Sequence, residues 1–250
     1  MLSIEGLSRL HGSQYALNNV DLEVRAGEVI GLIDREGTGL LELTALLSGA
    51  TSPDNGLVWL HGKRLQWPFR PQRHGIGILY REPQIVDTLD LASNIFLGNE
   101  YRQDQPYWRA LLPYAARRSY LDASDLIARL NLNLPSPHTL ASYLSNEQRQ
   151  LVAIAQLVVQ QPDLIIVDNP DRTLSLPYQE QLLYLIRGWQ QDKRAVIFGS
   201  ANLDYLFAVC DRIVILREGR VVIDCAADET NREETVAALA GSGDGSQQIT

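Results

Sequence analysis

The chain has 250 residues and a mass of 27.9 kDa, of which 45% of the residues are hydrophobic and 21% are charged. This composition is typical of a globular protein, and it excludes collagen-like, coiled-coil and largely disordered chains. The formal net charge of −8 argues against nucleic acid as a partner, because nucleic-acid binding needs a basic surface. Two cysteines, Cys210 and Cys225, are too few for a disulfide framework and fit a reducing compartment.

The predicted elements, taken in chain order, begin with strands. Residues 20–24 alternate between polar and apolar types, and residues 28–33 form an apolar run typical of a buried strand. Residues 40–47 have a helical composition that ends at Ser48 and Gly49. Further strands are predicted at residues 75–80, 164–167, 195–199, 212–216 and 221–224, and further helices at residues 121–130, 146–160, 177–190 and 203–209. Strands that alternate with helices of this length predict βαβ units and a mostly parallel sheet.

The chain is predicted to hold one domain over residues 1–240, with a helical subdomain inserted into an α/β core. Residues 83–159 lack strong strand signals, so residues 1–82 and 160–240 are expected to supply the core. Residues 241–250 are rich in Gly, Ser and polar types, which predicts a flexible tail. No run approaches the roughly 18–20 apolar residues of a membrane span, and the opening residues lack a signal-peptide pattern, so we expect a soluble chain.

One predicted strand–loop–helix segment has the context of a phosphate-binding loop. It reads GLIDREGTGLLE over residues 31–42, at the place where a G-x-x-x-x-G-K-[ST] loop would bind phosphate through its backbone N–H groups. Downstream motifs read LSNEQRQ at residues 144–150, LIIVDNP at 164–170 and FGSANL at 198–203. Each motif alone is a weak signal, but their joint order and spacing is specific.

In this order and spacing, the motifs resemble those of the ATP-binding cassette (ABC) ATPases over almost the whole chain. GIGILYRE at residues 75–82 and ASNIFLG at 92–98 are most similar to the ATPases of ribose- and xylose-type sugar importers. The resemblance implies an α/β, P-loop NTPase-like core with a mostly parallel sheet, an N-terminal antiparallel β subdomain, and a helical subdomain that carries the signature helix.

The same resemblance implies partners and a location. It implies transmembrane permease subunits and a second ABC ATPase subunit, which is either an active paralogue or another copy of this chain. Residues 81–98 lie where the family's cassettes receive the coupling helix of the permease. We therefore expect the chain at the cytoplasmic face of the inner or plasma membrane, held there by the permease.

The phosphate loop departs from the family pattern where the family contacts nucleotide. Leu40 and Leu41 stand in place of the lysine that contacts the phosphates and the Ser or Thr that binds Mg²⁺. Asp34 replaces the first glycine of the loop, whereas Gly37 and Gly39 remain. Because leucine offers no charge-assisted hydrogen bond, we expect no cofactor or only weakly bound ATP, without Mg²⁺.

At the other catalytic positions, too, the residues that act on water, metal or phosphate in the family are replaced. Asn169 replaces the family's general-base Glu, and an amide cannot take a proton from water. Ala201 replaces the His that contacts the γ-phosphate, and Arg81 replaces the Gln that contacts metal and water. Asp168 keeps the family's acidic residue beside Mg²⁺, and the motifs around it favour this interpretation over the alternative, a turn-capping role with Pro170.

The base-stacking and signature positions are altered as well. His11 stands where the family stacks an aromatic side chain on adenine. In the signature, Ser145 and Gln148 match the family, whereas Asn146 and Glu147 replace two glycines that let the backbone approach the partner's γ-phosphate. Glu147 instead places a carboxylate at this position.

Three functions are compatible with these replacements. The first is a non-catalytic nucleotide-binding-domain subunit of a sugar-type ABC importer, which completes the ATPase dimer. The second is a structural or regulatory scaffold without transport. The third is a weakly active ATPase in which Arg35 or Arg81 replaces the charge of the lost lysine. Removal of a lysine clamp or of a positioned base slows a reaction by about 10²–10⁴-fold each, which favours the first function over the third.

Overall fold

The computed structural model describes residues 1–35, 37–99 and 113–240. The predicted tail at residues 241–250 therefore lies outside the described residues. The chain forms two compact units. The first consists of Met1–Ile78, Pro162–Asp171 and Leu176–Thr250, and the second of Leu79–Gln161 and Arg172–Ser175.

The first unit contains an antiparallel sheet with the strand order β2-β1-β4-β5. Its strands are β1 (Leu2–His11), β2 (Gln14–Val24), β4 (Asn55–Leu60) and β5 (Lys63–Arg64). Most of this sheet carries no clear strand signal in the sequence. In β1 the pairing register with β2 shifts between Ile4 and Leu7, next to Gly6, which has a φ of 58°. This irregularity interrupts the period-two alternation by which a strand is predicted.

The other sheet has six strands in the order β10-β9-β3-β8-β7-β6. These are β3 (Val29–Asp34), β6 (Ile76–Leu79), β7 (Leu164–Asp168), β8 (Ala195–Gly199), β9 (Arg212–Arg217) and β10 (Arg220–Ala226). Strand β3 runs parallel to β8 and β9, and β7 runs parallel to β8, whereas β10 is antiparallel to β9. The prediction of a mostly parallel sheet is confirmed.

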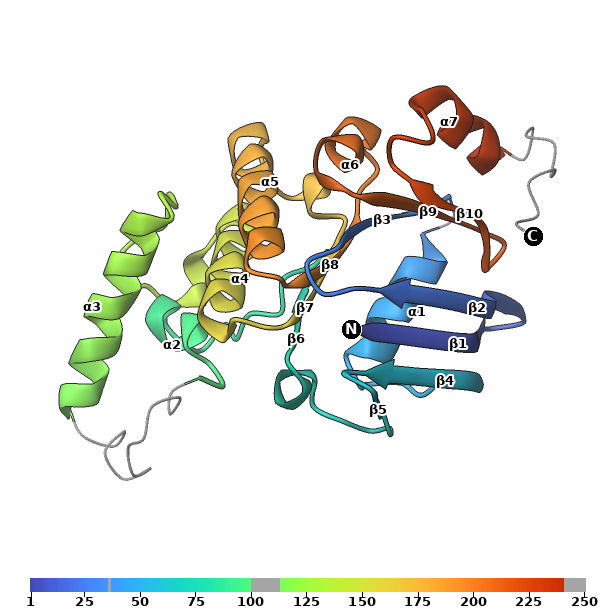
Figure 1. The fold of residues 1–250 in the computed structure, drawn as a ribbon. Helices are drawn as coiled ribbons and strands as arrows, with labels where there is room; N and C mark the ends of the chain where they lie inside the picture. The colour runs from blue at the N-terminus through green and yellow to red at the C-terminus, as the bar shows by residue number, and fades with distance from the viewer. Residues whose placement is uncertain (36, 100–112, 241–250) are drawn as a thin grey trace. The chain divides into compact units, whose positions relative to one another are not determined.

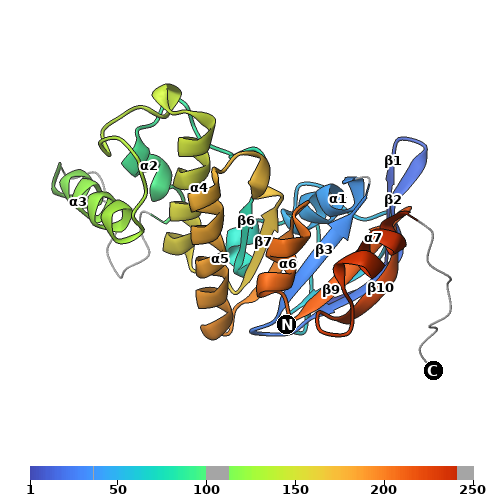
Figure 2. The same cartoon turned by 90° about the horizontal axis from the view of Figure 1, so that it is seen from above.

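Helices cover both faces of this sheet. They are α1 (Thr38–Leu47), α5 (Leu176–Gln191), α6 (Leu203–Val209) and α7 (Arg232–Ala240). In Figure 1, α1 lies below β3, between the two sheets, and it contacts β2, β3 and β7. Helices α6 and α7 lie on the other face, where they contact β3 and β9 respectively, and Figure 2 looks onto this face.

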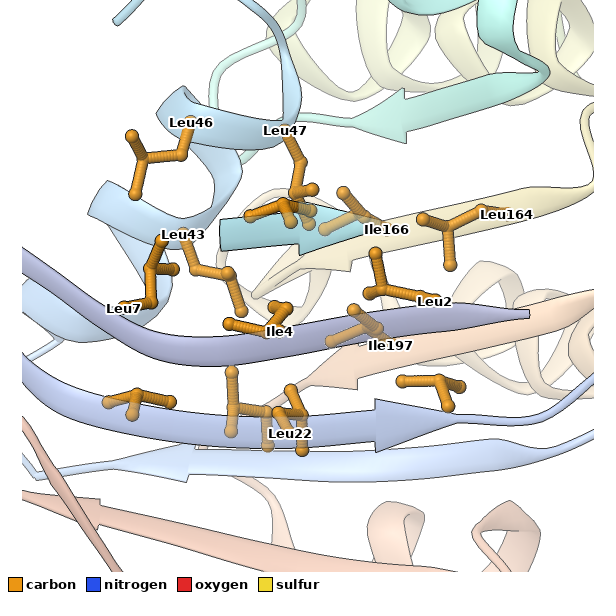
Figure 3. Close-up of a cluster of buried hydrophobic side chains, with 14 of the residues drawn as sticks. Leu2, Ile4, Leu7, Leu22, Leu43, Leu46, Leu47, Leu164, Ile166 and Ile197 are labelled. Atoms are coloured by element: carbon orange, nitrogen blue, oxygen red, sulfur yellow. The ribbon is translucent and has the colours of Figure 1, made fainter. Parts of the chain in front are cut away.

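The main core fills the space between the two sheets and α1 (Figure 3). Leu43 and Leu47 of α1, Ile4 of β1, Ile166 of β7 and Ile197 of β8 are all almost fully buried in this cluster. Burial of each such side chain contributes about 1.5–3 kcal/mol, so the cluster holds β3 and α1 together.

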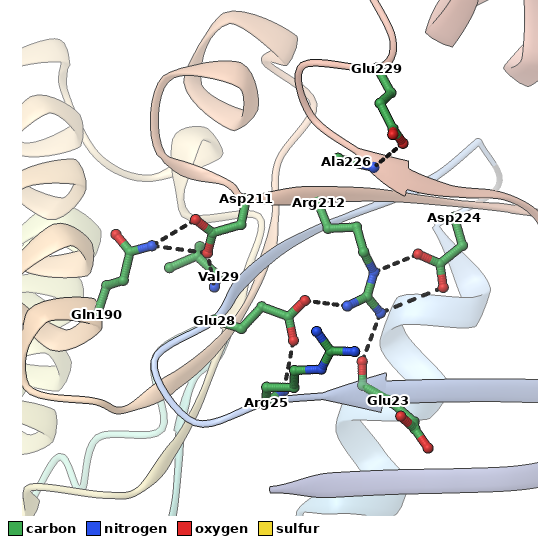
Figure 4. A network of polar contacts seen from close by, with 10 residues as sticks. All are labelled: Glu23, Arg25, Glu28, Val29, Gln190, Asp211, Arg212, Asp224, Ala226 and Glu229. Carbon is green, nitrogen blue, oxygen red and sulfur yellow. Dashed lines mark hydrogen bonds and ion pairs between the residues drawn. The ribbon is translucent and has the colours of Figure 1, made fainter.

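An ion-pair network at Arg212 ties together the strands next to this core (Figure 4). The Arg212 guanidinium pairs with Glu28 and, through Nε, with Asp224 Oδ1 at 2.5 Å, and its Nη2 donates to the Glu23 carbonyl oxygen at 2.7 Å. Partial burial alone would lower the pKa of Arg212, but the two carboxylates outweigh it and raise that pKa. The neighbouring residue Asp211 accepts a hydrogen bond from the Val29 backbone nitrogen at 2.8 Å, which fixes the start of β3.

The second unit is helical. Its helices are α2 (Leu91–Ile95), α3 (Pro113–Arg129) and α4 (Asn146–Gln160), together with the 3-10 turn Ala141–Tyr143. Further 3-10 turns of the chain lie at Pro71–His74 and Pro170–Arg172. Helix α4 has the bounds predicted from the sequence, because Ser145 and Gln148 form a capping box at its start. Among the helices that the structure describes, none is long and apolar enough to cross a membrane.

Candidate functional site

The phosphate-loop segment connects the end of β3 to the start of α1. Gly37 is the N-cap residue of α1 and adopts a left-handed conformation, with a φ of 70°. A Cβ at Gly39 would lie 2.9 Å from Leu216 Cδ1 and 3.2 Å from the Ala16 carbonyl oxygen, so no larger residue fits there without a shift. The two glycines retained in the sequence thus serve the turn and its close packing, as they would in a phosphate-binding loop.

The carboxylate of Asp34 lies at the start of α1. Its Oδ2 accepts hydrogen bonds from the backbone nitrogens of Gly39, at 2.5 Å, and of Leu40, at 3.4 Å. The first N–H groups of a helix have no partner within the helix and favour a negative charge, which is why such helix starts bind phosphate. In this chain, the Asp34 carboxylate accepts the hydrogen bonds of these N–H groups.

The two leucines at the start of α1 have opposite environments. Leu40 is 2% exposed and belongs to the main core, whereas Leu41 is 44% exposed. Leu40 packs so closely on Gly199 of β8 that a Cβ at Gly199 would lie 2.1 Å from Leu40 Cδ2. Leu40, which stands in place of the family's phosphate-contacting lysine, therefore points into the hydrophobic core.

Glu42 of α1 forms a pair with His11, the last residue of β1. His11 Nδ1 lies 2.7 Å from Glu42 Oε1, and Arg9 Nε lies 3.7 Å from Glu42 Oε2. Glu42 is mostly buried, whereas the His11 side chain is largely exposed. His11, the expected base-stacking residue, is thus paired with the carboxylate of Glu42 on α1. The two residues are 31 positions apart in the sequence, and no sequence pattern predicts their contact.

Asp168, the last residue of β7, and the following residue Asn169 both lie beside Gly199 of β8. Asp168 is buried, and its Oδ1 accepts a hydrogen bond from Asn169 Nδ2 at 2.9 Å. Asn169 has a φ of 45°, and its backbone nitrogen donates to the Gly199 carbonyl oxygen at 3.0 Å. The amide of Asn169 therefore serves as a donor to the acidic residue that the resemblance assigns to Mg²⁺.

The loop after β8 is held by an acidic residue that the sequence analysis did not identify. The backbone nitrogen of Ala201 donates to Asp171 Oδ2 at 3.2 Å, and Gln179 Nε2 donates to the Asp171 carbonyl oxygen at 3.0 Å. Arg35, one of the two arginines considered as a substitute cation, donates from Nη1 to the Leu239 carbonyl oxygen at the end of α7, at 3.3 Å.

In the second unit, the signature residues form the start of α4. Ser145 Oγ accepts from the Gln148 backbone nitrogen at 3.2 Å, and Gln148 Oε1 accepts from the Ser145 backbone nitrogen at 3.0 Å. Glu147 Oε1 accepts from the Ser175 backbone nitrogen at 2.7 Å. The Glu147 carboxylate, which replaces a signature glycine together with Asn146, thus supports the neighbouring loop.

The segment that the resemblance assigns to permease contact is organised by Asn94. This buried side chain accepts from the Val86 backbone nitrogen and donates to the carbonyl oxygens of Val86, Leu89 and Asp90 at 3.0–3.3 Å. Arg81, at the start of the segment, accepts a hydrogen bond on its carbonyl oxygen from Thr173 Oγ1 at 3.4 Å. Val86 and Leu97 are each 39% exposed, which leaves apolar surface at both ends of the segment.

Solved structures share this fold. A dimeric ATP-binding cassette in a post-hydrolysis state, bound to ADP and phosphate, superposes with a TM-score of 0.76 over 91% of this chain and 99% of that chain, at 20% identity. The ATP-binding subunit of another ABC transporter superposes with a TM-score of 0.79 over 96% of this chain and 99% of that chain, at 21% identity. The fold is therefore that of an ABC ATPase cassette, as the resemblance implied.

Sequence comparison identifies the family. The sequence pattern of the ABC transporter family matches residues 17–172, and the chain belongs to this family. It is 29% identical to the ribose import ATP-binding protein RbsA of Geobacillus kaustophilus, over 96% of this chain and 48% of that protein. It is 30% identical to RbsA 1 of Burkholderia cenocepacia, over 96% of this chain and 46% of that protein. It is 28% identical to the galactose/methyl galactoside import ATP-binding protein MglA of Treponema denticola, over 96% of this chain and 47% of that protein. The chain spans about half the length of these relatives.

Proposed function

We propose that the chain is a non-catalytic cassette subunit of an ABC importer of the sugar type. In this role it completes an ATPase dimer and docks on transmembrane permease subunits, but it does not hydrolyse ATP. The observation that carries the proposal is the Asp34 carboxylate, which takes the backbone donors of Gly39 and Leu40 at the start of α1.

The residues at the catalytic positions do not fit a magnesium-bound triphosphate. A triphosphate needs cations, yet the loop offers the carboxylates of Asp34 and Glu42. The Leu40 side chain is buried in the core, so this position offers no cation to a phosphate. Asn169 cannot act as a general base, because an amide nitrogen has no basic lone pair.

The importer role and its partners are supported by the relatives. Their names assign them to the import of ribose and of galactose or methyl galactoside, and one of the superposed cassettes is a dimer. We propose that the second cassette is an active paralogue or another copy of this chain. The permease would hold the pair at the cytoplasmic face of the membrane, through the segment organised by Asn94.

The test measures binding and hydrolysis of ATP by the purified chain. We expect no Mg²⁺-dependent phosphate release above a buffer blank, and a Kd for MgATP above roughly 1 mM, which corresponds to about 4 kcal/mol of binding free energy. An ABC cassette that has the lysine and the glutamate serves as the positive control. Turnover near 1 s⁻¹, at the low end of usual enzyme rates, or micromolar affinity in calorimetry would overturn the proposal.

A second measurement addresses the assembly. The tagged chain is isolated from detergent-solubilised membranes of its own host, and the co-purifying proteins are identified by mass spectrometry. We expect a multi-span ABC permease in stoichiometric amount. Recovery of the chain only as a free monomer would contradict the importer role and favour the scaffold function.

A further inference from the structure

One stretch of this acidic protein has the opposite charge. Between Asp54 and Glu82 the sequence contains no carboxylate, although the chain as a whole has 30 Asp and Glu residues. The same stretch contains five cationic residues, Lys63, Arg64, Arg70, Arg73 and Arg81, and also two of the four histidines of the chain. Among the described residues, no carboxylate forms an ion pair with Lys63, Arg64, Arg70 or Arg73.

Part of this basic stretch lines a pocket within the first unit, in the connection between β5 and β6. The pocket has a volume of about 480 Å³ and is lined by Pro68, Phe69, Arg70, Arg73 and His74. Arg70 immediately precedes the 3-10 turn Pro71–His74, and the Arg73 backbone nitrogen donates to the Arg70 carbonyl oxygen at 3.1 Å. The turn therefore brings two arginines and a histidine to the lining of one pocket.

The aromatic wall of the pocket is held in place by its neighbours. The ring of Phe69 makes edge-to-face contacts with Trp67, at 5.6 Å between centroids, and with His74, at 5.1 Å. Trp67 is itself fixed, because its Nε1 donates to the Leu46 carbonyl oxygen at the end of α1, at 2.9 Å. Asp163, which packs beside Gly75 at the end of the turn, is paired with His61 rather than with a pocket cation.

We propose that this pocket binds a phosphate monoester. A phosphate group carries a charge of about −1.5 to −2 and three acceptor oxygens, which match the three N–H-bearing side chains of Arg70, Arg73 and His74. Guanidinium groups bind phosphate through paired, charge-assisted hydrogen bonds. The volume is within the range of small-molecule sites, and the Phe69 ring provides an apolar surface for the organic part of the ester.

The proposed ligand chemistry has two natural sources, a free phosphorylated small molecule and the headgroup of an anionic lipid. Phenyl phosphate is the probe for the first source, because it joins a phosphate group to a ring that can contact Phe69. Vesicles of phosphatidylcholine with phosphatidic acid are the probe for the second source, and vesicles of phosphatidylcholine alone are their blank. The site is independent of the nucleotide positions, so this test and that of the proposed function can fail separately.

The experiment compares three single variants with the unmodified chain by calorimetry and vesicle sedimentation. We expect saturable binding of phenyl phosphate that Arg70→Ala and Arg73→Ala each weaken about tenfold or more, because each removes charge-assisted hydrogen bonds. Arg64→Ala is the matched control: Arg64 is an exposed arginine on β5 outside the pocket lining, and its loss should change the affinity less than about twofold. Binding to the acidic vesicles with the same variant pattern would identify the lipid as the source.

Three outcomes would overturn the proposal. The first is the absence of saturable binding to both phenyl phosphate and the acidic vesicles. The second is binding that the double variant Arg70→Ala/Arg73→Ala retains, because the probe would then occupy another part of the chain. The third is an equal loss in Arg64→Ala, which would indicate general attraction to the basic stretch. All variants carry exposed replacements, and their circular dichroism spectra and melting temperatures verify that they are folded.

Discussion

The Oδ2 atom of Asp34 lies 2.5 Å from the backbone nitrogen of Gly39, so a residue at the end of β3 caps the helix that follows it. We expect Asp34→Gly to lower the free energy of unfolding by about 1 kcal/mol, as the loss of a capping carboxylate does. The same variant frees backbone N–H donors at the loop, so its affinity for inorganic phosphate should rise. Urea unfolding and phosphate titration measure the two effects.

Asp34→Asn is the control for this prediction. Its amide oxygen retains an acceptor at the helix start but removes the charge, so the loss of stability should be smaller than in Asp34→Gly. Neither variant should hydrolyse ATP, because Asn169 and Ala201 are unchanged. An Asp34→Gly protein of unaltered stability would show that the carboxylate does not cap the helix in solution.

The adjacent residues Leu40 and Leu41 allow the same substitution to be compared at a buried and at an exposed position. Leu40→Ala should lower the free energy of unfolding by about 2–4 kcal/mol, because it leaves a cavity against Gly199 in the main core. Leu41→Ala removes the same atoms from an exposed site and should change stability by less than about 0.5 kcal/mol. Equal effects in chemical denaturation would contradict the inward orientation of Leu40.

The sequence motifs predicted the parallel sheet and the start of α4 well, because buried apolar runs and a Ser–Gln capping box are local signals. They did not predict the contacts of the charged residues near the phosphate loop. From the sequence, Asp34 is only the residue that replaces the first glycine of the loop. Its partners in the structure are the backbone nitrogens five and six positions further on, at the start of the helix that follows Gly37. The partner of Ala201, Asp171, is 30 residues away, and no local sequence pattern predicts this contact.

A hydrogen bond in the second unit should respond to acid. Tyr120 Oη donates to Asp90 Oδ2 at 2.6 Å, and the Tyr120 ring lies 3.7 Å from that of His138. Partial burial alone would raise the pKa of Asp90, but the hydrogen bonds from Tyr120 and Ser93 outweigh it and hold that pKa below its ordinary value of 3.8. A lowered pKa in the folded state means that the unfolded state binds more protons, so this contribution to stability is full above the ordinary value and is lost as the pH falls through the folded pKa.

The corresponding variant is Tyr120→Phe. At pH 7 it should lower the free energy of unfolding by about 1 kcal/mol, and the difference from the unmodified chain should shrink as the pH falls below 3.8. Tyr143→Phe, which changes an exposed tyrosine of the same unit, should have no measurable effect at either pH. A loss of stability that is the same at pH 7 and pH 3 would argue against an ionised partner for Tyr120.

The exposed ends of the segment organised by Asn94 test the proposed docking. Val86→Glu and Leu97→Glu place charge on apolar surface and should weaken the association with the permease while the chain stays folded. Ile95→Glu is unsuitable for this purpose, because Ile95 is fully buried and a charge there would unfold the unit. Tyr184→Glu, at an exposed apolar position on α5 in the other unit, serves as the control. Co-purification yields measure the association, and normal yields with folded Val86→Glu and Leu97→Glu proteins would exclude this segment as the contact.

The bonds of Asn94 have a structural consequence. Its side chain joins the Val86 backbone to α2, while its carbonyl oxygen accepts from Gln156 Nε2 of α4 at 2.6 Å. The Val86 backbone is therefore connected to α4 through two successive side-chain hydrogen-bond contacts, from Asn94 and from Gln156. Since α4 begins at Asn146, with Ser145 as its N-cap residue, this path of hydrogen bonds connects the Val86 segment to the helix that starts at the signature positions.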